Sequence, residues 1–544
     1  MPIMSRSLRS LTIILLGIAN QALLVANAAE DAQPKDVPSL VKNLCAKDPR
    51  SRSLAATELG NMGERAGSAV PALIRLLADE GIVAFGIPGA NVRDAASEAL
   101  SRIGRPAVGG LVAALGSGDA RVRGGAAAAL GGICPPPKES LPALLPLLRD
   151  GSVEVRLKAL DTIGKMRGEA TVALGAVLEV MGNDLIPIVR QHAARAAASV
   201  ATDGTKVIPA LIRRLHDDAP DMRGEAARAI GDYGRAAAVA VVPLTEALSD
   251  DGARWQAEAA DVNRPRAVRY DVASALGKIG PAAVSALPKL RELSRADAER
   301  EVRVAAALAV LRINAADDEA LPVIIKVVED DADILGQLVA FEALETLGIR
   351  AVRATGTLKK ALRHRHSEVR GGAASALAAV AGKAAVPLLI QCLGEEKRAG
   401  DRRRDLDRDY QDDKFVRWQI AEGLGKIGPD AGDAVTVLSE TLADTGEDVM
   451  LRRSAAISLG RIGPAAHKAV PQLIGVLSDG QANLRHAAVV ALGEIGPLAR
   501  TAAQPLLRLA EADPDKGIQE AASAAIQRIV RDDGGKSPSK THEN

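Results

Sequence analysis

The chain has 544 residues, of which 47% are apolar and 25% charged, and its formal net charge is +1. This balance is typical of a well-buried protein and gives no excess charge that would draw the chain to nucleic acid or to a membrane surface. Only eight residues are aromatic, too few for one large globular core, whereas abundant small apolar residues suit thin layers of close-packed helices. The three cysteines, Cys45, Cys134 and Cys392, are an odd number far apart in sequence and predict no disulfide framework.

The N-terminal residues differ from the rest of the chain. Arg6 and Arg9 precede an apolar run over residues 11–25, and a small-residue cleavage pattern ends at Ala28. This arrangement predicts a signal peptide over residues 1–28, followed by a spacer over residues 29–35. The alternative is an uncleaved membrane anchor, but the run is short and carries Asn20 and Gln21. No other stretch is expected to span a bilayer. From the signal peptide we expect an exported bacterial protein in the periplasm, on the cell surface or outside the cell.

Residues 448–499 contain two tandem copies of one pattern. In the first copy, apolar or small residues stand at Ala455, Ala456, Leu459 and Ile462, and this spacing predicts one face of an amphipathic helix. Gly463 suits the left-handed turn that ends such a helix, and Pro471 suits the first turn of a second helix. The pattern therefore predicts a helical hairpin, which the second copy repeats from Arg485 onward.

The same hairpin can be followed along nearly the whole chain by its leucine-like position in the second helix. These positions are Leu59, Leu100, Leu130, Ile163, Ala197, Ile230, Leu276, Val310, Leu347, Leu377, Leu424, Leu459, Leu492 and Ile526. One hairpin cannot bury its own apolar stripe, so each must stack on its neighbours. The sequence predicts an all-α fold, an α-solenoid of about fourteen hairpins over residues 36–533, and a disordered tail over residues 532–544.

The motif of a proline-led helix, an aspartate turn and a VR–AA–ALG–IG helix resembles HEAT repeats. It looks closest to the short variety also found in phycobilin lyases, as in VRYDVASALGKIG at residues 268–280 and VRWQIAEGLGKIG at residues 416–428. The resemblance implies a solenoid that serves as a binding surface, with the arginine-led helices on its concave side.

Seven residues before the leucine-like position stands a recurring arginine. The members are Arg52, Arg93, Arg123, Arg156, Arg190, Arg223, Arg269, Arg303, Arg370, Arg417, Arg452 and Arg485, and the exceptions are Ala340 and Gln519. Aspartates recur just upstream, so arginine–aspartate pairs at the turn would satisfy both charges. We interpret this arginine ladder as structural, as in other HEAT arrays. A positively charged groove for nucleic acid is the alternative, and it would show steeply salt-dependent DNA binding.

Three insertions, residues 81–91, 251–266 and 395–414, interrupt the repeats at the same place, between the proline-led and the arginine-led helix. Six of the eight aromatic residues lie at these junctions: Phe85, Trp255 and Tyr410 are within the insertions, and Tyr270, Phe415 and Trp418 open the helices that follow. Aromatic side chains are common anchors of recognition surfaces, and long loops on a rigid scaffold often carry function. These residues are therefore the candidate binding site. The alternative is that each ring only packs its own loop onto the array.

The third insertion also carries the alternating charges of residues 400–414, for which a solvated, self-paired loop is expected. Within it, Arg402, Arg403 and Arg404 form the only dense basic run, and we include them as candidate binding residues. His364 and His366 form one HxH pair, which by itself is weak evidence for a metal.

No sequence motif for a catalytic site or a phosphate loop is present. The sequence thus predicts a non-catalytic, monomeric scaffold that needs no cofactor or metal and binds a protein or peptide, not nucleic acid, on its concave face and inserted edge. The alternative, suggested by the repeat type, is a bilin lyase or another chromophore-handling enzyme. Incubation with bilin and an apo-phycobiliprotein would then give a coloured covalent adduct.

Overall fold

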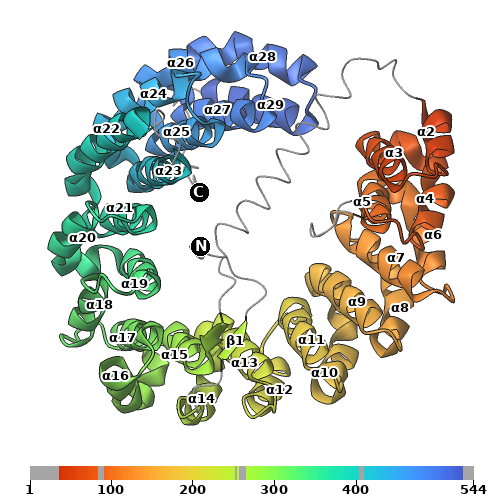
Figure 1. Ribbon diagram of the computed structural model, residues 1–544, viewed down its shortest axis with the longest axis horizontal. Helices are drawn as coiled ribbons and strands as arrows, with labels where there is room; N and C mark the ends of the chain where they lie inside the picture. The colour runs from red at the N-terminus through yellow and green to blue at the C-terminus, as the bar shows by residue number, and fades with distance from the viewer. Residues whose placement is uncertain (1–35, 84–90, 251–253, 257–264, 404–409, 531–544) are drawn as a thin grey trace, which may run out of the picture. The chain divides into compact units, whose positions relative to one another are not determined.

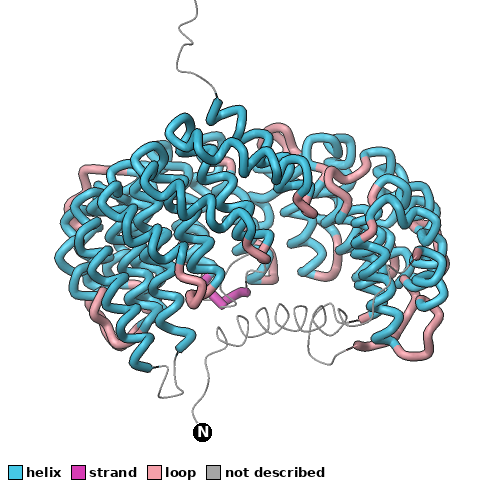
Figure 2. The backbone as a smooth tube through the Cα atoms, turned by 90° about the horizontal axis from the view of Figure 1, so that it is seen from above, coloured by secondary structure: helices cyan, strands magenta, loops and turns pink. Residues whose placement is uncertain are grey.

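The computed structural model describes residues 36–83, 91–250, 254–256, 265–403 and 410–530. The predicted signal peptide, the spacer and the C-terminal tail lie outside these ranges. The chain divides into two compact units, residues 1–290 with 312–314, and residues 291–311 with 315–544. Helices make up nearly all of the described chain (Figure 2).

The described helices pair into fourteen hairpins, as the sequence predicts. The first helices of the hairpins, called outer helices here, are α2 (Val37–Asn43), α4 (Val70–Leu76), α6 (Val108–Ala114), α8 (Leu141–Leu144), α10 (Leu174–Asn183), α12 (Val207–Arg214), α14 (Val241–Ala247), α16 (Leu287–Ala296), α18 (Ala320–Val328), α20 (Thr355–Ala361), α22 (Val386–Arg403), α24 (Val435–Ala443), α26 (Val470–Gly475) and α28 (Ala503–Ala512).

The second helices begin with the arginine-bearing turn and are called inner helices here. They are α3 (Pro49–Asn61), α5 (Val92–Ile103), α7 (Ala120–Gly132), α9 (Val153–Lys165), α11 (Pro187–Val200), α13 (Pro220–Asp232), α15 (Val268–Ile279), α17 (Arg300–Ile313), α19 (Ile334–Leu347), α21 (Ser367–Ala381), α23 (Tyr410–Ile427), α25 (Val449–Ile462), α27 (Ala482–Ile495) and α29 (Lys516–Val530). Within each unit they lie on the concave side (Figure 1).

The core runs along the inner helices. In α25 the side chains of Ala455, Ala456, Leu459 and Ile462 are fully buried, as their spacing predicts. Gly463 ends this helix with φ of +70°, a conformation that costs glycine little. The short helix η12 (Gly463–Ala469) then leads into the next outer helix, and most other repeats have a similar short helix at this place.

A second glycine of the ALG–IG motif has a different role. Gly460 lies inside α25, and a Cβ atom there would come within 2.9 Å of the Cα atom of Ala491 in α27. Gly231 meets Ala275 in the same way at 2.8 Å. The helix-ending role that the sequence predicts for Gly463 is therefore not the role of every glycine in the motif. Some are needed inside a helix because successive inner helices pack backbone against backbone.

The second insertion forms the only strand pair in the described residues. Strands β1 (Arg254–Gln256) and β2 (Pro265–Ala267) are antiparallel, with Trp255 opposite Arg266. The third insertion differs from the expected loop, because α22 continues to Arg403 and α23 already begins at Tyr410. Glutamate, lysine and arginine are good helix formers, so the charged sequence extends both helices beyond the usual repeat length.

One stretch, Ser367–Lys397, is long and apolar enough to cross a membrane by length and composition, which the sequence analysis did not anticipate. In the structure, Gly382 with φ of +51° separates it into α21 and α22, and 56% of its most apolar window is buried in the protein. It therefore forms part of the core as a hairpin.

Candidate binding surface

At most of its positions, the arginine ladder joins a repeat to the next one. The Nε and one terminal nitrogen of Arg123 donate to the Asp150 carboxylate at 2.7 and 2.9 Å, and its other terminal nitrogen donates to the Ser117 carbonyl oxygen at 2.8 Å. The planar guanidinium matches this carboxylate fork. Because Ser117 belongs to the turn of its own repeat and Asp150 to the turn of the next, one side chain holds both turns.

The same pairing recurs along both units. The further pairs are Arg52–Asp79, Arg156–Asp184, Arg190–Asp217, Arg223–Asp250, Arg370–Glu396, Arg417–Glu447, Arg452–Asp479 and Arg485–Asp513.

The acidic partner differs from the one expected within the same turn. In several repeats the aspartate six residues before the arginine offers its backbone carbonyl oxygen, as Asp150 does to Arg156 at 2.8 Å. Its carboxylate caps its own turn and points back to the arginine of the preceding repeat.

Three members of the ladder have other contacts. Arg93 lies 3.7 Å from Glu154, while Asp119, in the turn of the next repeat, pairs with Arg121 at 2.7 Å. Arg269 donates to the Asp250 carbonyl oxygen at 2.7 Å, and Arg303 to that of Asp297 at 2.6 Å.

The two repeats without arginine both carry glutamine. The sequence alignment placed Leu347 and Ala340 in α19, but Leu347 directly precedes the helix-ending Gly348, as Ile462 precedes Gly463. The leucine-like residue is therefore the fully buried Leu344, and the ladder position is Gln337. The alignment was wrong by one helical turn because apolar residues surround both positions.

Glutamine replaces the ladder arginine where the following repeat supplies no carboxylate to pair with it. Twenty-seven residues after Gln337, at the position that Asp150 holds relative to Arg123, stands His364. Gln519 lies in the last described helix, and its amide donates to the Asp513 carbonyl oxygen at 2.8 Å, as an arginine would. A neutral side chain keeps the carbonyl contact without burying a cation that has no carboxylate.

The ladder contacts perturb the acids. Hydrogen bonds from Arg123 lower the pKa of Asp150, and those from Arg485 lower the pKa of Asp513. Burial alone would raise the pKa of Asp217, but its contacts with Arg190 and a backbone N–H lower the pKa overall. These arginines are thus neutralised by carboxylates of the array, which leaves the ladder poorly suited to hold a polyanion.

Among the predicted binding residues, two rings at the start of α23 lie together. Phe415 packs on α21, since a Cβ atom at Gly371 would come within 2.9 Å of its ring. The Trp418 ring meets Phe415 edge to face, with centroids 5.9 Å apart. Both are half-buried, as is Tyr270 in the first turn of α15. Phe415 thus has a packing role, whereas Trp418 keeps part of its surface in solvent.

The other predicted residues are placed less fully. Phe85 and Arg404 lie outside the described residues. Trp255 lies in β1, Arg402 and Arg403 in the last turn of α22, and Tyr410 at the start of α23, with only their backbone described. The structure therefore brings together Phe415 and Trp418 alone from this set.

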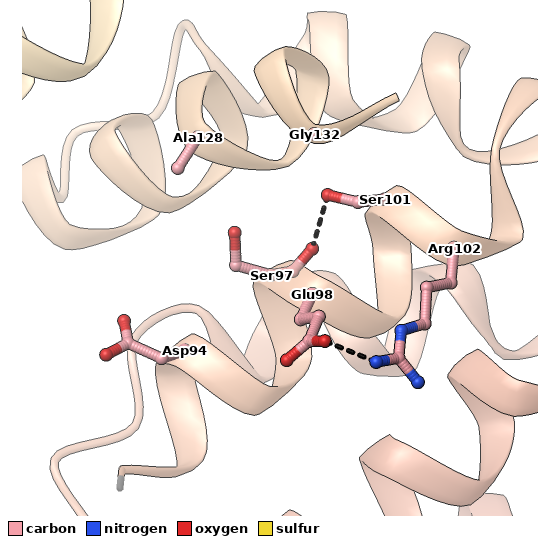
Figure 3. Close-up of a pocket in the computed structure, with 7 residues that line it drawn as sticks. All are labelled: Asp94, Ser97, Glu98, Ser101, Arg102, Ala128 and Gly132. Carbon is pink, nitrogen blue, oxygen red and sulfur yellow. Dashed lines mark hydrogen bonds and ion pairs between the residues drawn. The ribbon is translucent and has the colours of Figure 1, made fainter. Parts of the chain in front are cut away.

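A shallow open cavity of about 440 Å³ lies between α5 and α7 (Figure 3). Its lining is Asp94, Ser97, Glu98, Ser101, Arg102, Ala128 and Gly132. The Ser101 hydroxyl contacts the Ala129 and Ser97 carbonyl oxygens at 2.8 and 3.0 Å, and Glu98 pairs with Arg102 at 2.5 Å. These groups are engaged with one another and offer no nucleophile beside a base.

Charged contacts between α11 and α13 were not found from the sequence. Glu225 is fully buried and contacts both Arg195, at 3.3 Å, and Arg228. Burial alone would lower the pKa of Arg228, but the Glu225 carboxylate raises it overall. The sequence signal was weak, because the same register position, two residues after the ladder arginine, is also charged at Lys158 and Asp271.

Metal chemistry finds no support in the described ranges, which contain no group of three or more His, Cys, Asp or Glu side chains that could hold an ion. The rings of His364 and His366 stack at 5.4 Å, and the His364 Nδ1 accepts the His366 backbone N–H. One histidine nitrogen is thus already used in the turn.

Comparison with known proteins identifies the repeat. A family model for HEAT repeats matches residues 108–196, 175–264, 321–406 and 442–527, more than half of the chain. Yeast importin-β (Kap95p) is similar in structure, with a TM-score of 0.51 and 13% identity over 91% of this chain and 69% of that one.

A second importin-β structure, in ammonium sulfate, gives a TM-score of 0.48 and 14% identity over 95% of this chain and 76% of its own. The CpcE–CpcF phycocyanin lyase complex of Nostoc gives 0.27 and 23% identity over 49% and 97%. The comparison with curated proteins gives no match. On the family match and the fourteen described helical hairpins, the chain belongs to the HEAT-repeat family.

Proposed function

We propose that this protein is an exported, non-catalytic scaffold that binds a protein or peptide along its inner helices and the edge that carries the insertions. One observation carries the proposal: the repeats share the same arginine ladder and helix packing, but they carry different side chains at the helix position directly after the ladder residue. Directly after the ladder position stand Asp94, Tyr270, Trp418, Arg453 and His486, all exposed or half-buried. Such variation on a fixed scaffold suits recognition of a particular partner by many modest contacts.

The ladder supports the proposal because the residues that stack the repeats differ from those that are exposed to a partner. The arginines and acids stack the repeats, and the glycines permit close packing, so these residues need not take part in binding. The remaining exposed side chains of the inner helices are then available to a partner. Trp418 is a candidate anchor because large, partly exposed aromatic rings are frequent hot spots of interfaces.

A co-purification experiment tests the binding surface. The full chain and a Tyr410→Ala/Trp418→Ala variant are used to capture proteins from the native exported fraction, which are identified by mass spectrometry. We expect the variant to lose most of the captured partner while its helical circular dichroism is unchanged. Val172→Ala, at an exposed site in the turn helix η5 (Arg167–Ala173), is the control. Equal capture by both variants would contradict the role of the aromatic residues.

Export has its own test. The native host is fractionated and the N-terminus of the protein is sequenced. We expect a mature chain that begins at Ala29 or Glu30, in the periplasmic, surface or external fraction. A chain that retains Met1 and stays in the cytosol would contradict export and leave the binding proposal standing.

A further inference from the structure

The outer surface of one repeat carries only positive charges. Residues 346–367 contain six arginines and lysines and no aspartate or glutamate, in a chain that is otherwise close to neutral. They include the turn helix η8 (Gly348–Ala354) and α20. Figure 1 shows α20 on the outer side of its unit, behind the inner helices α19 and α21.

Four of these cations form a feature that we call the basic strip: Arg353, Lys359, Lys360 and Arg363. All four are exposed, and none has a hydrogen-bond or ion-pair partner among the described residues. The ladder arginines differ, because each of the paired ones is neutralised by a carboxylate. The basic strip therefore keeps its charge available to a ligand.

The strip continues into an apolar end. Ile349 and Val352 in η8 expose 69% and 52% of their surface. Within α20, Gly356, Lys359 and Lys360 lie three or four residues apart, so they share one face. Arg353 lies at the end of η8, directly before α20, and Arg363 lies in the turn directly after it. A Cβ atom at Gly356 would meet nothing within 4 Å, so bare backbone lies open between Arg353 and Lys359.

Acidic side chains border this surface. On the side of α18, Glu329 accepts a hydrogen bond from Thr357 of α20 at 3.0 Å, and Asp331 is exposed. On the side of α22, Glu395 is exposed, and its charge reaches Cys392, as does that of Arg363. The positive surface is thus about one helix wide.

We propose that the basic strip binds an extended acidic peptide segment of a partner protein, with an aliphatic side chain of the segment against Ile349 and Val352. The 15 residues from Ile349 to Arg363 form most of η8, all of α20 and the turn that follows it. At about 1.5–2 Å per helical residue they are roughly 20–30 Å long, which about six to nine extended residues would cover. Acidic side chains would then face Lys359, Lys360 and Arg363.

The narrow width favours a peptide over a broad anionic surface. A membrane plane would bring lipid phosphates against Glu329 and Asp331 as well as against the strip, and like charges repel. Nucleic acid would gain nothing from the aliphatic end. This inference goes beyond the proposed function, since it uses the outer helices and none of the inserted residues.

Fluorescence anisotropy with the full chain tests it. The probe is a labelled octapeptide whose first two residues are leucine and whose other six are glutamate or aspartate, at about 50 mM salt so that surface charges are not fully screened. We expect Lys359→Glu/Lys360→Glu to weaken binding about tenfold or more. Arg75→Glu/Arg213→Glu, at exposed sites of α4 and α12, makes the same change in net charge and should leave affinity within about twofold.

Two further variants make the test specific. Lys359→Gln/Lys360→Gln removes the charges without reversing them and should weaken binding by roughly threefold to tenfold. Val352→Ser should weaken binding of the leucine-bearing peptide about twofold and leave an all-acidic octapeptide unaffected.

The proposal is overturned if Lys359→Glu/Lys360→Glu binds the peptide like the parent, or if the control variant loses as much. It is also overturned if vesicles of phosphatidylserine and phosphatidylcholine, or a DNA strand of equal charge, compete with the peptide as well as unlabelled peptide does. The co-purification experiment on Trp418 reads a different surface, so failure of one proposal is distinguishable from failure of the other.

Discussion

Removal of Arg123 should uncouple two neighbouring repeats. Its guanidinium makes two bonds of 2.7 and 2.9 Å to Asp150, and the two side chains are only 18% and 7% exposed. Arg123→Ala leaves the Asp150 carboxylate largely out of water, held by the Ser152 backbone N–H at 2.9 Å. Breaking a largely buried pair in this way costs about 2–4 kcal/mol, less than a fully buried pair because some solvent reaches the arginine.

An exposed pair in the same region provides the matched control. Arg149 and Glu179 also come from successive repeats and lie 2.8 Å apart, but their side chains are 75% and 51% exposed. Solvent screening limits such a pair to about 0–1 kcal/mol. The burial of the ladder pair, and not its distance, should therefore set the difference between the two.

Double-mutant cycles measure both pairs. Each residue is replaced by alanine singly and together, and stability is followed by urea unfolding and by amide hydrogen exchange in α7 and α9. Exchange is the more direct measurement because a repeat array can open locally. We expect a coupling of about 1.5–3 kcal/mol for Arg123–Asp150 and below about 1 kcal/mol for Arg149–Glu179. Equal couplings would refute the reasoning that the ladder holds the repeats together.

Two further predictions concern the ladder as a whole. Because the pKa values of Asp150, Asp479 and Asp513 are lowered on folding, their contribution to stability is present above the ordinary value of 3.8 and is lost as the pH falls through the lowered folded values. The thermal midpoint should be flat near neutral pH and should fall below about pH 4, and Asp150→Asn should reduce this acid sensitivity. Separately, Gln337→Arg should destabilise the second unit by about 1–3 kcal/mol, and adding His364→Asp should recover most of that loss by supplying the missing acid. A double variant less stable than Gln337→Arg in urea unfolding would contradict the pairing rule.

Most of the fold could be predicted from local sequence. Ala455, Leu459 and Ile462 recur with the period of a helix, and Gly463 and Pro471 mark where one helix ends and the next begins. The error at Leu347 arose where the period was ambiguous: Leu344 and Leu347 are both apolar and both buried. Only the place of Gly348, which ends the helix directly after Leu347, shows that Leu344 is the leucine-like residue of this repeat.

The candidate binding surface was less predictable. Sequence spacing placed Phe415 and Trp418 at the start of the helix after the third insertion, but it could not show that the Phe415 ring packs against Gly371 of another helix. The basic strip was missed because only the structure shows that its four side chains are exposed and have no hydrogen-bond or ion-pair partner among the described residues. An alternating run of charges drew attention to the third insertion instead, where α22 extends to Arg403 and α23 begins at Tyr410.

The sequence by itself determined that the chain forms stacked helical hairpins, since the 3.6-residue periodicity and the helix-ending signals are local properties. Only the tertiary structure decided which acid each arginine holds. The partner of Arg123 is Asp150, 27 residues away in the next repeat. Asp119 is only four residues away in sequence, but its carboxylate pairs with Arg121. A carboxylate and a guanidinium pair by distance in space, and that distance is fixed by how closely the glycine-bearing inner helices pack.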